Sequence, residues 1–436
     1  MCTQQVVQDA VQFGVWDYIG VGECDEAFPL LVDRLARNDP ALLHTPNFYV
    51  RLSDGTFKRN PLGRYPDLNA LPPEDYEVFD LKSMLQQKNG WQSILTSRGC
   101  PYRCSYCLNH EVSDRYLHEA HQPRTAYLRR YDVNRIIPEI QSLRQRHPYI
   151  QMFIFDDDLF TLDENYVREF CKAYLDAGIP TPFVVNAHVQ SFTEPMAKAL
   201  AEAPCMIVKF GIESGSPELR QKVLDRHMSN QQIINAFELC HSYGLHSSAF
   251  LMFGLPFETR AMIDETIDLV ARIKPGRMRW AIFYPFAGTK AYEICRLANQ
   301  IDYDKMNAMD NYFVASCLKF DAATDLLVQK LQRTFHWYVN ARTDWETADI
   351  YRKLVEEVER IPARDWPAAR DQILTRDREL SNGLLAQARP HYSIRYTEVM
   401  AVHGDYVLAE KGEAKDRAAR RWVAFRNQMA AAQRGN

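Results

Sequence analysis

The sequence has little of what marks membrane, secreted or nucleic-acid-binding proteins. No apolar run reaches the roughly 18 residues that a membrane-spanning helix needs, and the N-terminal stretch lacks the basic start and apolar core of a signal peptide. The 52 basic and 56 acidic residues nearly cancel, which leaves a formal net charge of −4. We therefore expect a cytoplasmic protein with no nucleic-acid partner and no membrane span.

Cysteine is also scarce, with 10 residues in a chain of 436. This density is too low for a disulfide scaffold, and in a reducing cytosol clustered thiols more often hold metal or react. Three of the cysteines nevertheless lie within one short stretch, GCPYRCSYC, at Cys100, Cys104 and Cys107. Hydrophobic residues are abundant, at 46% of the chain, which is enough for sizeable buried cores.

From residue 91 onward, short apolar runs alternate with amphipathic helical patterns. The runs have the β-branched and aromatic content of buried parallel strands, and they lie at residues 92–97, 151–157, 182–188, 205–213, 247–254 and 279–285. Helical spacing of apolar residues is found at 133–147, 164–178, 230–244 and 261–274. Such repetition requires right-handed parallel crossovers. It predicts an α/β fold, either a partial (β/α)6 TIM-like barrel or an open sheet, with ligands at the C-terminal ends of the strands.

The chain before this repeat has a different pattern. Residues 17–39 predict one strand and one helix, and a hairpin is expected around residues 53–56. A proline-rich linker follows at residues 61–76. This is too little chain for a full α/β domain, so we expect a truncated α/β segment over residues 1–85.

The repeat ends near residue 300, and the C-terminal region is predicted to be mostly helical. Strands are expected near residues 394–399 and 406–408, and an amphipathic helix over residues 415–429. We predict a core barrel over residues 86–300 and a C-terminal region over 301–436 that covers the substrate. The aromatic run at residues 335–338 belongs either to the core or to the pocket wall.

The clustered cysteines form a C-x3-C-x2-C motif in the loop after the first predicted strand. Thiolates are soft ligands for iron–sulfur clusters and for zinc. A structural site is closed by four protein ligands, whereas three leave one coordination position open for chemistry. The main structural alternative is a zinc site that His110 completes, and a disulfide is disfavoured by the compartment.

The motif, its position and Tyr106 between its last two cysteines resemble the radical S-adenosylmethionine (SAM) superfamily. The resemblance implies that Cys100, Cys104 and Cys107 bind three irons of a 4Fe-4S cluster, whose fourth iron is chelated by SAM. It implies reductive cleavage of SAM to a 5′-deoxyadenosyl radical that abstracts hydrogen from substrate. It also implies two kinds of partner: an external one-electron reductant, flavodoxin or ferredoxin, and a small-molecule or peptide substrate.

An acidic run, FDDDLFT, ends the second predicted strand where the family holds the methionine amine. The resemblance makes Asp156, Asp157 and Asp158 candidates for that contact, with Asp157 the first choice. The alternative is that Asp158 or Thr161 caps the following helix.

Two further segments extend the resemblance to the ends of later strands. In GIESGS, Glu213 and Ser214 are expected to approach the ribose or the methionine carboxylate of SAM. In FGLPFET, Gly254 and Pro256 are expected to shape the turn whose backbone contacts the adenine.

Three isolated residues are additional candidates. Asn186 and Tyr284 follow the third and sixth strands, with core or capping roles as the alternative. Arg226 either pairs with the methionine carboxylate or lies on the surface. Cys295 and Cys317 have no spacing that supports a second cluster, so we expect buried free thiols.

The motif set most resembles the branch that carries an N-terminal cobalamin-binding domain, such as anaerobic magnesium-protoporphyrin monomethyl ester cyclase and carbon methyltransferases. Residues 17–35 resemble the last strand and helix of that domain, and 67–76 its connection to the barrel. No Asp-x-His-x-x-Gly motif occurs, and His44 is the one histidine before residue 100. Either the chain is part of a longer protein, or it has lost cobalamin and kept a remnant as a brace.

The resemblance implies methyl transfer to carbon, or cyclisation or rearrangement of a natural product. Two alternatives remain open at this point. One is a cobalamin-free enzyme of the methylthiolation or RNA-modification type, although the chain shows no basic β-barrel composition for RNA. The other is a non-catalytic partner subunit that binds zinc or a cluster.

Overall fold

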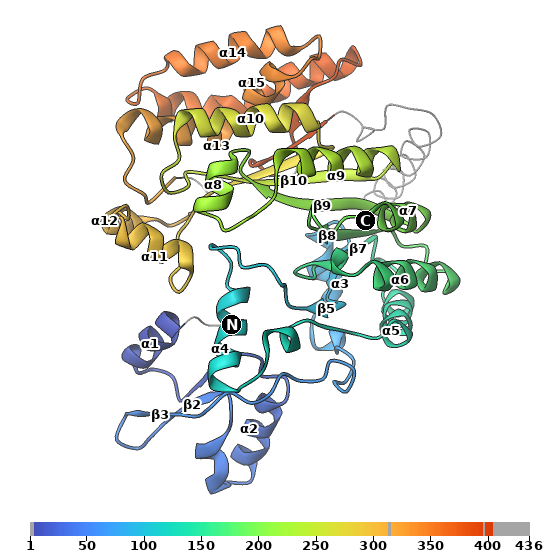
Figure 1. Ribbon diagram of the computed structural model, residues 1–436, viewed down its shortest axis with the longest axis vertical. Coiled ribbons are helices and arrows are strands. Elements are labelled where there is room, and N and C mark those ends of the chain that lie inside the picture. The colour runs from blue at the N-terminus through green and yellow to red at the C-terminus, as the bar shows by residue number, and fades with distance from the viewer. Residues whose placement is uncertain (1–3, 313–314, 396, 404–436) are drawn as a thin grey trace.

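The computed structural model describes residues 4–312, 315–395 and 397–403. The N-terminal strands lie at one end of its long axis, and helices of the C-terminal region lie at the other (Figure 1). Between them stands a sheet that the described residues build from eight strands, in the order β12-β13-β11-β10-β9-β8-β7-β4.

Six of these strands are parallel and follow one another in the chain. They are β4 (Trp91–Ile94), β7 (Met152–Phe155), β8 (Phe183–Ala187), β9 (Cys205–Glu213), β10 (His246–Phe253) and β11 (Arg277–Ile282). A hairpin of β12 (Tyr392–Ile394) and β13 (Met400–His403) then adds antiparallel to β11. Strands β4 and β12 form the two edges, so the barrel is open. The predicted TIM-like six-strand fold is confirmed.

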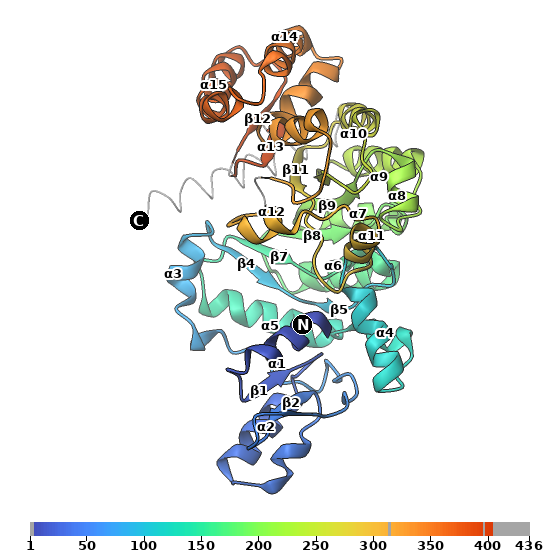
Figure 2. The ribbon, with the colours of Figure 1, turned by 90° about the vertical axis from the view of Figure 1, so that its left-hand side faces the viewer.

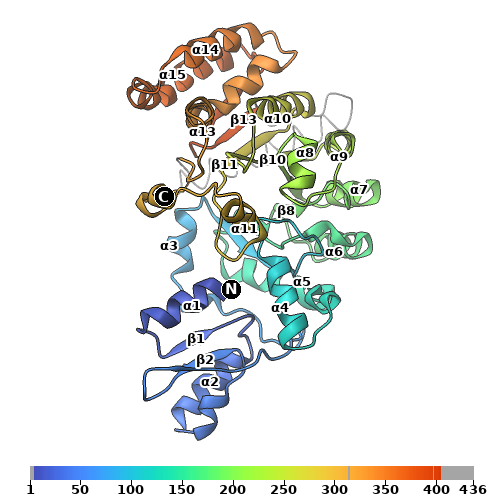
Figure 3. The same cartoon turned by 60° about the vertical axis from the view of Figure 1, so that its left-hand side comes forward.

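The helices between these strands cover one face of the sheet, and Figure 3 shows them along one side. They are α5 (Val133–Arg146), α6 (Glu164–Asp176), α7 (Glu194–Glu202), α8 (Pro217–Lys222), α9 (Asn230–Ser242) and α10 (Arg260–Ile273). Alternate strand residues such as Phe155, Phe210 and Trp280 face these helices in one large core. The residues between them point to the opposite, inner face.

The N-terminal segment forms a small sheet of its own. It contains α1 (Gln4–Phe13), β1 (Tyr18–Gly20), α2 (Ala27–Ala36), β2 (Phe48–Arg51), β3 (Phe57–Arg59) and α3 (Leu81–Gln86), with 3-10 turns at Pro40–His44 and Tyr76–Val78. Strands β2 and β3 are the predicted hairpin, and β1 pairs antiparallel with β2. Figure 2 shows this sheet at the opposite end of the molecule from α14 and α15.

Helix α4 (Asn109–Glu119) joins that segment to the barrel. Its Tyr116 is fully buried among residues of the N-terminal segment and stacks on Tyr65 at 3.9 Å between ring centroids. Nearby, β5 (Ser97–Arg98) pairs antiparallel with β6 (Arg129–Arg130). Further 3-10 turns lie at Arg124–Tyr127 and Phe160–Leu162.

After β11, α11 (Lys290–Leu297) returns to the cysteine loop, where the Ala291 amide donates to the Ser105 carbonyl at 2.8 Å. The C-terminal region comprises α12 (Tyr303–Ala308), α13 (Ala322–Arg342), α14 (Ala348–Arg360) and α15 (Trp366–Ala386). Phe335 of α13 packs on Phe253 and Trp280, so the aromatic run is core, as one of the two sequence alternatives held. The segments predicted at 406–408 and 415–429 lie outside the described residues. No helix in the described ranges is long and apolar enough to cross a membrane.

Candidate active site

The cysteine loop begins at a glycine that no other residue replaces easily. Gly99 has φ +97°, and a Cβ there would lie 2.3 Å from the carbonyl oxygen of Tyr127. Its amide donates to Oδ2 of Asp158 at 3.1 Å. The chain therefore leaves β5 in a left-handed conformation, pressed against the 124–127 turn.

Three anchors hold the loop against the C-terminal end of α8 and the residue after β8. Ser105 donates from its hydroxyl to the Val223 carbonyl at 2.6 Å and from its amide to the Leu224 carbonyl at 2.9 Å. The Tyr102 ring stacks on His188, just beyond β8, at 3.9 Å between centroids. These anchors, which the sequence did not single out, fix a loop whose own internal backbone bond runs from the Cys107 amide to the Cys104 carbonyl.

Arg226 is the charged partner of the loop. It is only 7% exposed, and its Nη1 lies 3.2 Å from Sγ of Cys104 and 3.2 Å from the hydroxyl of Tyr106. Its Nη2 donates to the carbonyl of Gly211 at 2.5 Å. The surface alternative for Arg226 is therefore wrong, because the guanidinium is buried against the cysteine loop.

Tyr106 and Glu213 complete this network. The Tyr106 hydroxyl donates to Oε1 of Glu213 at 3.0 Å, and Glu213 has φ +66°, which is rare for a residue with a side chain. Gly211 makes this possible, since a Cβ there would lie 2.5 Å from Oε1 of Glu213. Burial raises the pKa of Glu213, and Arg226 opposes that rise. The strained backbone thus brings a carboxylate from β9 to the cysteine loop.

The thiols themselves fit a polynuclear cluster. Cys100, Cys104 and Cys107 are free cysteines, and burial raises the pKa of Cys100 to about 12 and also raises that of Cys107. A metal bound to these thiols would displace their protons. Among the described residues no group of three or more His, Cys, Asp or Glu side chains is placed to hold a single metal ion. The zinc alternative with His110 finds no support here.

The acidic run divides into three roles. Both carboxylate oxygens of Asp157 are occupied, because Thr96 and Ser97 donate to them from their amides and hydroxyls. Burial raises the pKa of Asp157 to about 6 against these bonds. Asp157 thus fixes the two residues that lead into the cysteine loop, while its contact with methionine stays a prediction.

The neighbours of Asp157 face in other directions. Asp156 is 44% exposed and accepts from the Ser93 hydroxyl at 2.7 Å, whereas Asp158 binds the amide of Gly99. Helix α6 is capped by Asp163, which accepts from the Tyr166 amide, so the capping alternative for Asp158 and Thr161 is wrong.

The remaining strand-end candidates are mostly bound within the protein. Asn186 donates to the Asp157 carbonyl at 2.8 Å. Ser214 is fully buried, and its hydroxyl lies 3.3 Å from that of Thr266 on α10. Tyr284 packs its ring on Phe286 at 5.0 Å between centroids. Roles of these three in binding SAM stay predictions.

The turn after β10 is shaped by a buried carboxyl group. Oε2 of Glu258 accepts from the amides of Gly254 at 2.7 Å and Leu255 at 3.2 Å. Gly254 has φ +72°, and Pro256 is buried beside it. Burial raises the pKa of Glu258 to about 8, although both amides oppose the rise. The predicted Gly254–Pro256 turn therefore exists, and Glu258 holds it in shape.

An ion-pair cluster links the cysteine loop to the N-terminal segment. Arg98, directly before Gly99, donates to both oxygens of Asp25 at 2.8 Å and to Glu23 at 2.7 Å. Arg129, its neighbour across β5 and β6, also pairs with Glu23. Sequence reasoning does not reveal this cluster, because the partners lie more than 70 positions apart.

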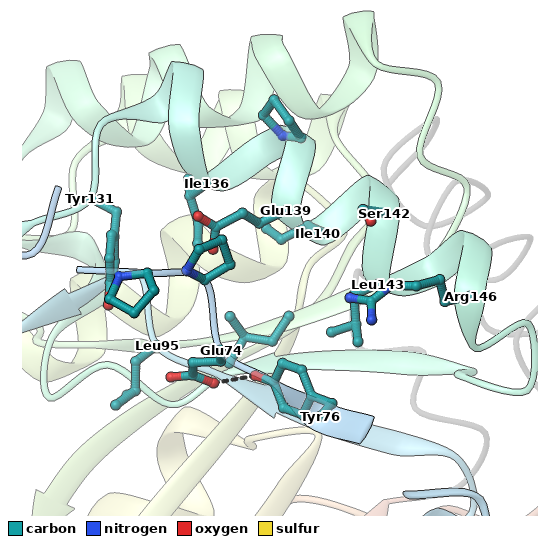
Figure 4. A pocket seen from close by; sticks show the side chains of 14 residues that line it. Glu74, Tyr76, Leu95, Tyr131, Ile136, Glu139, Ile140, Ser142, Leu143 and Arg146 are labelled. Atoms are coloured by element: carbon teal, nitrogen blue, oxygen red, sulfur yellow. Dashed lines mark hydrogen bonds between the residues drawn. The ribbon is translucent and has the colours of Figure 1, made fainter. Parts of the chain in front are cut away.

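A cavity of about 240 Å³ lies elsewhere, between the proline-rich linker, the end of β4 and α5. Figure 4 shows Glu74 and Tyr76 side by side at its wall, joined by a hydrogen bond. None of the three cysteines and none of the strand-end candidates lines it. The cavity is therefore distinct from the cysteine loop and its neighbouring strand ends.

Comparison with known protein families agrees with the resemblance that the cysteine loop carries. Residues 94–270 match the Radical SAM superfamily profile. The segment runs from the last residue of β4 through β10 and includes all three cysteines. The chain therefore carries a radical SAM domain over these residues.

Named relatives place it near the branch expected from the sequence. The uncharacterized methyltransferase PH0819 of Pyrococcus horikoshii is 26% identical over 65% of this chain and 59% of its own length. The anaerobic magnesium-protoporphyrin IX monomethyl ester cyclase of Cereibacter sphaeroides is 22% identical over 59% of this chain and 40% of its own. The chain thus spans about half the length of these relatives.

A solved structure shares the fold over nearly the whole chain. The cobalamin-dependent SAM radical enzyme OxsB, determined with aqua-cobalamin and SAM, matches 98% of this chain and 65% of its own, with a TM-score of 0.58 and 14% identity. The fold resemblance therefore extends beyond the radical SAM domain to both flanking regions.

Proposed function

We propose that this chain is an enzyme that holds a 4Fe-4S cluster on Cys100, Cys104 and Cys107 and cleaves SAM reductively. The observation that carries the proposal is three unpaired thiols on one anchored loop, with the guanidinium of Arg226 against Cys104. When bound, the cluster and SAM supply the electron transfer and the radical that abstracts hydrogen from substrate.

The chain's own residues hold that chemistry in place. Arg226 keeps its charge despite burial, because Tyr106, Cys104 and Glu213 raise its pKa. Its N–H groups stabilise negative charge on the Cys104 sulfur, and one of them holds the end of β9 through the Gly211 carbonyl. Asp157 and Asp158 orient the chain that enters the loop.

For the reaction, we propose methyl transfer to carbon, or cyclisation or rearrangement of a small-molecule or peptide product. The named relatives, one a methyltransferase and one a cyclase, support both classes. An external one-electron donor, flavodoxin or ferredoxin, completes the proposal. The proposal does not include cobalamin for this chain: in the described residues His44 is exposed, and its ring nitrogens lie 3.0 and 3.1 Å from Nζ of Lys58.

We further propose that the chain is organised as three regions, 1–85, 86–300 and 301–436. The small N-terminal sheet, the parallel sheet and the helices α13 to α15 support this division. Helix α13 packs on the outer face of β11, where Trp280 donates to the Gln332 carbonyl at 3.0 Å. That the C-terminal region also covers substrate stays a prediction.

The test uses full-length protein reconstituted anaerobically with iron and sulfide. We expect about four irons per chain and release of 5′-deoxyadenosine from SAM with dithionite, both lost in Cys104→Ala. Cys240→Ala is the matched control, since Cys240 is a buried thiol on α9 far from the loop in sequence. One zinc per chain without nucleoside release would overturn the proposal.

A further inference from the structure

The inner face of the sheet carries a group of cations that the contacts of the cysteine loop do not include. Partly exposed positions alternate with buried ones along β9 and β11, and Lys209 and Arg279 occupy such positions. Lys209 pairs in register with Ser248, and Ser248 with Arg277. Arg279 lies two residues further along β11, so all three cations share this face.

The acidic side chain beside Lys209 on this face is Asp156, and it is shared. Oδ1 of Asp156 lies 3.4 Å from Nζ of Lys209, a long contact, and its other oxygen is occupied by Ser93. Arg277 is 7% exposed and donates from Nε to the Ser248 hydroxyl at 2.9 Å. For the guanidinium of Arg279, no hydrogen bond or ion pair is found within the described residues.

Like charges brought together in this way need a counter-ion. Burial lowers the pKa of Lys209, and the positive charges of Arg277 and Arg279 lower it further, while Asp156 opposes them. The side chain of Lys209 is only 13% exposed, so solvent screens it weakly. An anion placed among these groups would relieve their repulsion and form charge-assisted hydrogen bonds.

The position is separate from the cysteine loop. Lys209 lies four residues before Glu213 on β9, a separation of about 13 Å along a strand. Between them on this face stands Gly211, which contributes no side chain, and across β10 it is level with Phe250 and Arg279. The place of a side chain at Gly211 is taken by Oε1 of Glu213, 2.5 Å from where a Cβ would lie, and by Nη2 of Arg226 at 3.5 Å, so the candidates for binding SAM adjoin the cations on this face.

We propose that the substrate of this enzyme carries an oxyanion, a carboxylate or a phosphate, that binds between Lys209 and Arg279 on the inner face of the sheet. The proposal rests on the proposed function, because it names the substrate class of that site. The ammonium group of Lys209 and the guanidinium group of Arg279 anchor the anionic end of the substrate. The rest of the molecule extends along β9 toward Glu213 and the cysteine loop. Recognition of a planar or tetrahedral oxyanion suits the forked guanidinium of Arg279.

The test measures binding without turnover, by isothermal titration calorimetry on the reconstituted full chain at constant ionic strength. The probes are inorganic phosphate, succinate and the neutral succinamide. We expect phosphate or succinate to bind and succinamide not to bind, with affinity about tenfold weaker in Arg279→Gln and largely kept in Arg279→Lys. Arg272→Gln, which removes an exposed cation on α10, is the matched control and should match the native chain.

The outcomes distinguish a phosphate from a carboxylate on the substrate, and they distinguish this inference from the proposed function. Binding of phosphate alone assigns a phosphorylated substrate, and binding of succinate alone a carboxylate. Equal binding of all three probes, no binding of any, or no difference between Arg279→Gln and Arg272→Gln would overturn the inference. Loss of SAM binding in Arg279→Gln without loss of phosphate or succinate binding would assign Arg279 to SAM and overturn it as well. Absence of SAM cleavage with intact anion binding would instead count against the proposed function alone.

Discussion

Nη1 of Arg226 lies 3.2 Å from Sγ of Cys104, although the two residues are 122 positions apart. The same guanidinium contacts Tyr106, and through it Glu213. A fixed positive charge beside a cluster ligand stabilises the more negative, reduced state of a cluster. The first prediction follows from this contact.

Arg226→Gln should lower the midpoint potential of the reconstituted cluster and slow SAM cleavage at least about tenfold, while Arg226→Lys should lie between. Removing a charge-assisted N–H···S bond penalises reduction, whereas the lysine keeps the charge but loses the fork. Redox titration monitored by electron paramagnetic resonance measures the potential. Arg272→Gln should leave it unchanged, and an unshifted potential in Arg226→Gln would remove Arg226 from this role.

Asp25→Asn should loosen the cysteine loop from the N-terminal segment. The substitution breaks the two-pronged contact with Arg98, which directly precedes Gly99, and leaves a partly buried guanidinium short of acceptors. We expect faster amide hydrogen exchange across residues 97–107 and a loss of roughly 1 kcal/mol in stability.

The matched control is Asp33→Asn, which breaks an exposed pair with Arg37 on α2. Exposed helical pairs contribute little, so this variant should exchange like the native chain. If Asp25→Asn and Asp33→Asn exchange alike, Arg98 does not couple the two parts of the chain.

Gly99→Ala should abolish iron binding, whereas Gly178→Ala should not. Both glycines have positive φ, at +97° and +64°, so both substitutions cost about 1 kcal/mol in backbone strain. A Cβ at Gly99 would in addition lie 2.3 Å from the Tyr127 carbonyl oxygen, while nothing lies within 4 Å of one at Gly178. Iron analysis and urea unfolding distinguish the two, and equal iron content would show that the crowding is relieved without cost to the loop.

The sheet and the cysteine motif could be predicted because their signals are local. A short apolar run marks each strand, and the C-x3-C-x2-C motif can be recognised within one nine-residue stretch. The first strand was nevertheless predicted too long, since β4 ends at Ile94 and Ser97 begins β5. Apolar content does not reveal that the chain changes pairing partner at that point.

The site contacts could not be predicted because they join distant segments. The sequence does not distinguish the three consecutive aspartates. In the structure, Asp157 accepts hydrogen bonds from Thr96 and Ser97, whereas Asp156 pairs with Lys209. Only the register of neighbouring strands decides which carboxylate faces which way. The same holds for Arg98 and Asp25, whose pairing depends on how the N-terminal segment packs on the barrel.

The turn after β10 predicts a specific pH dependence of stability. The pKa of Glu258 is raised from 4.5 to about 8 because the carboxyl group is buried, against the amides of Gly254 and Leu255. The folded protein therefore keeps a proton that the unfolded chain releases. The stabilisation is full below about pH 4.5 and is lost as the pH rises toward 8, after which it changes no further.

Glu258→Gln should remove this loss. Glutamine keeps a carbonyl oxygen for the two amides and does not ionise, so the variant should match the native chain near pH 5 and exceed it near pH 8. Since one pKa unit corresponds to about 1.4 kcal/mol, we expect a gain of roughly 1–3 kcal/mol at the higher pH. Urea unfolding at both pH values measures it, with the exposed Glu238→Gln on α9 as the control. A constant difference between Glu258→Gln and the native chain across this range would show that Glu258 is already ionised in the fold, and that the turn at Gly254 tolerates a buried carboxylate.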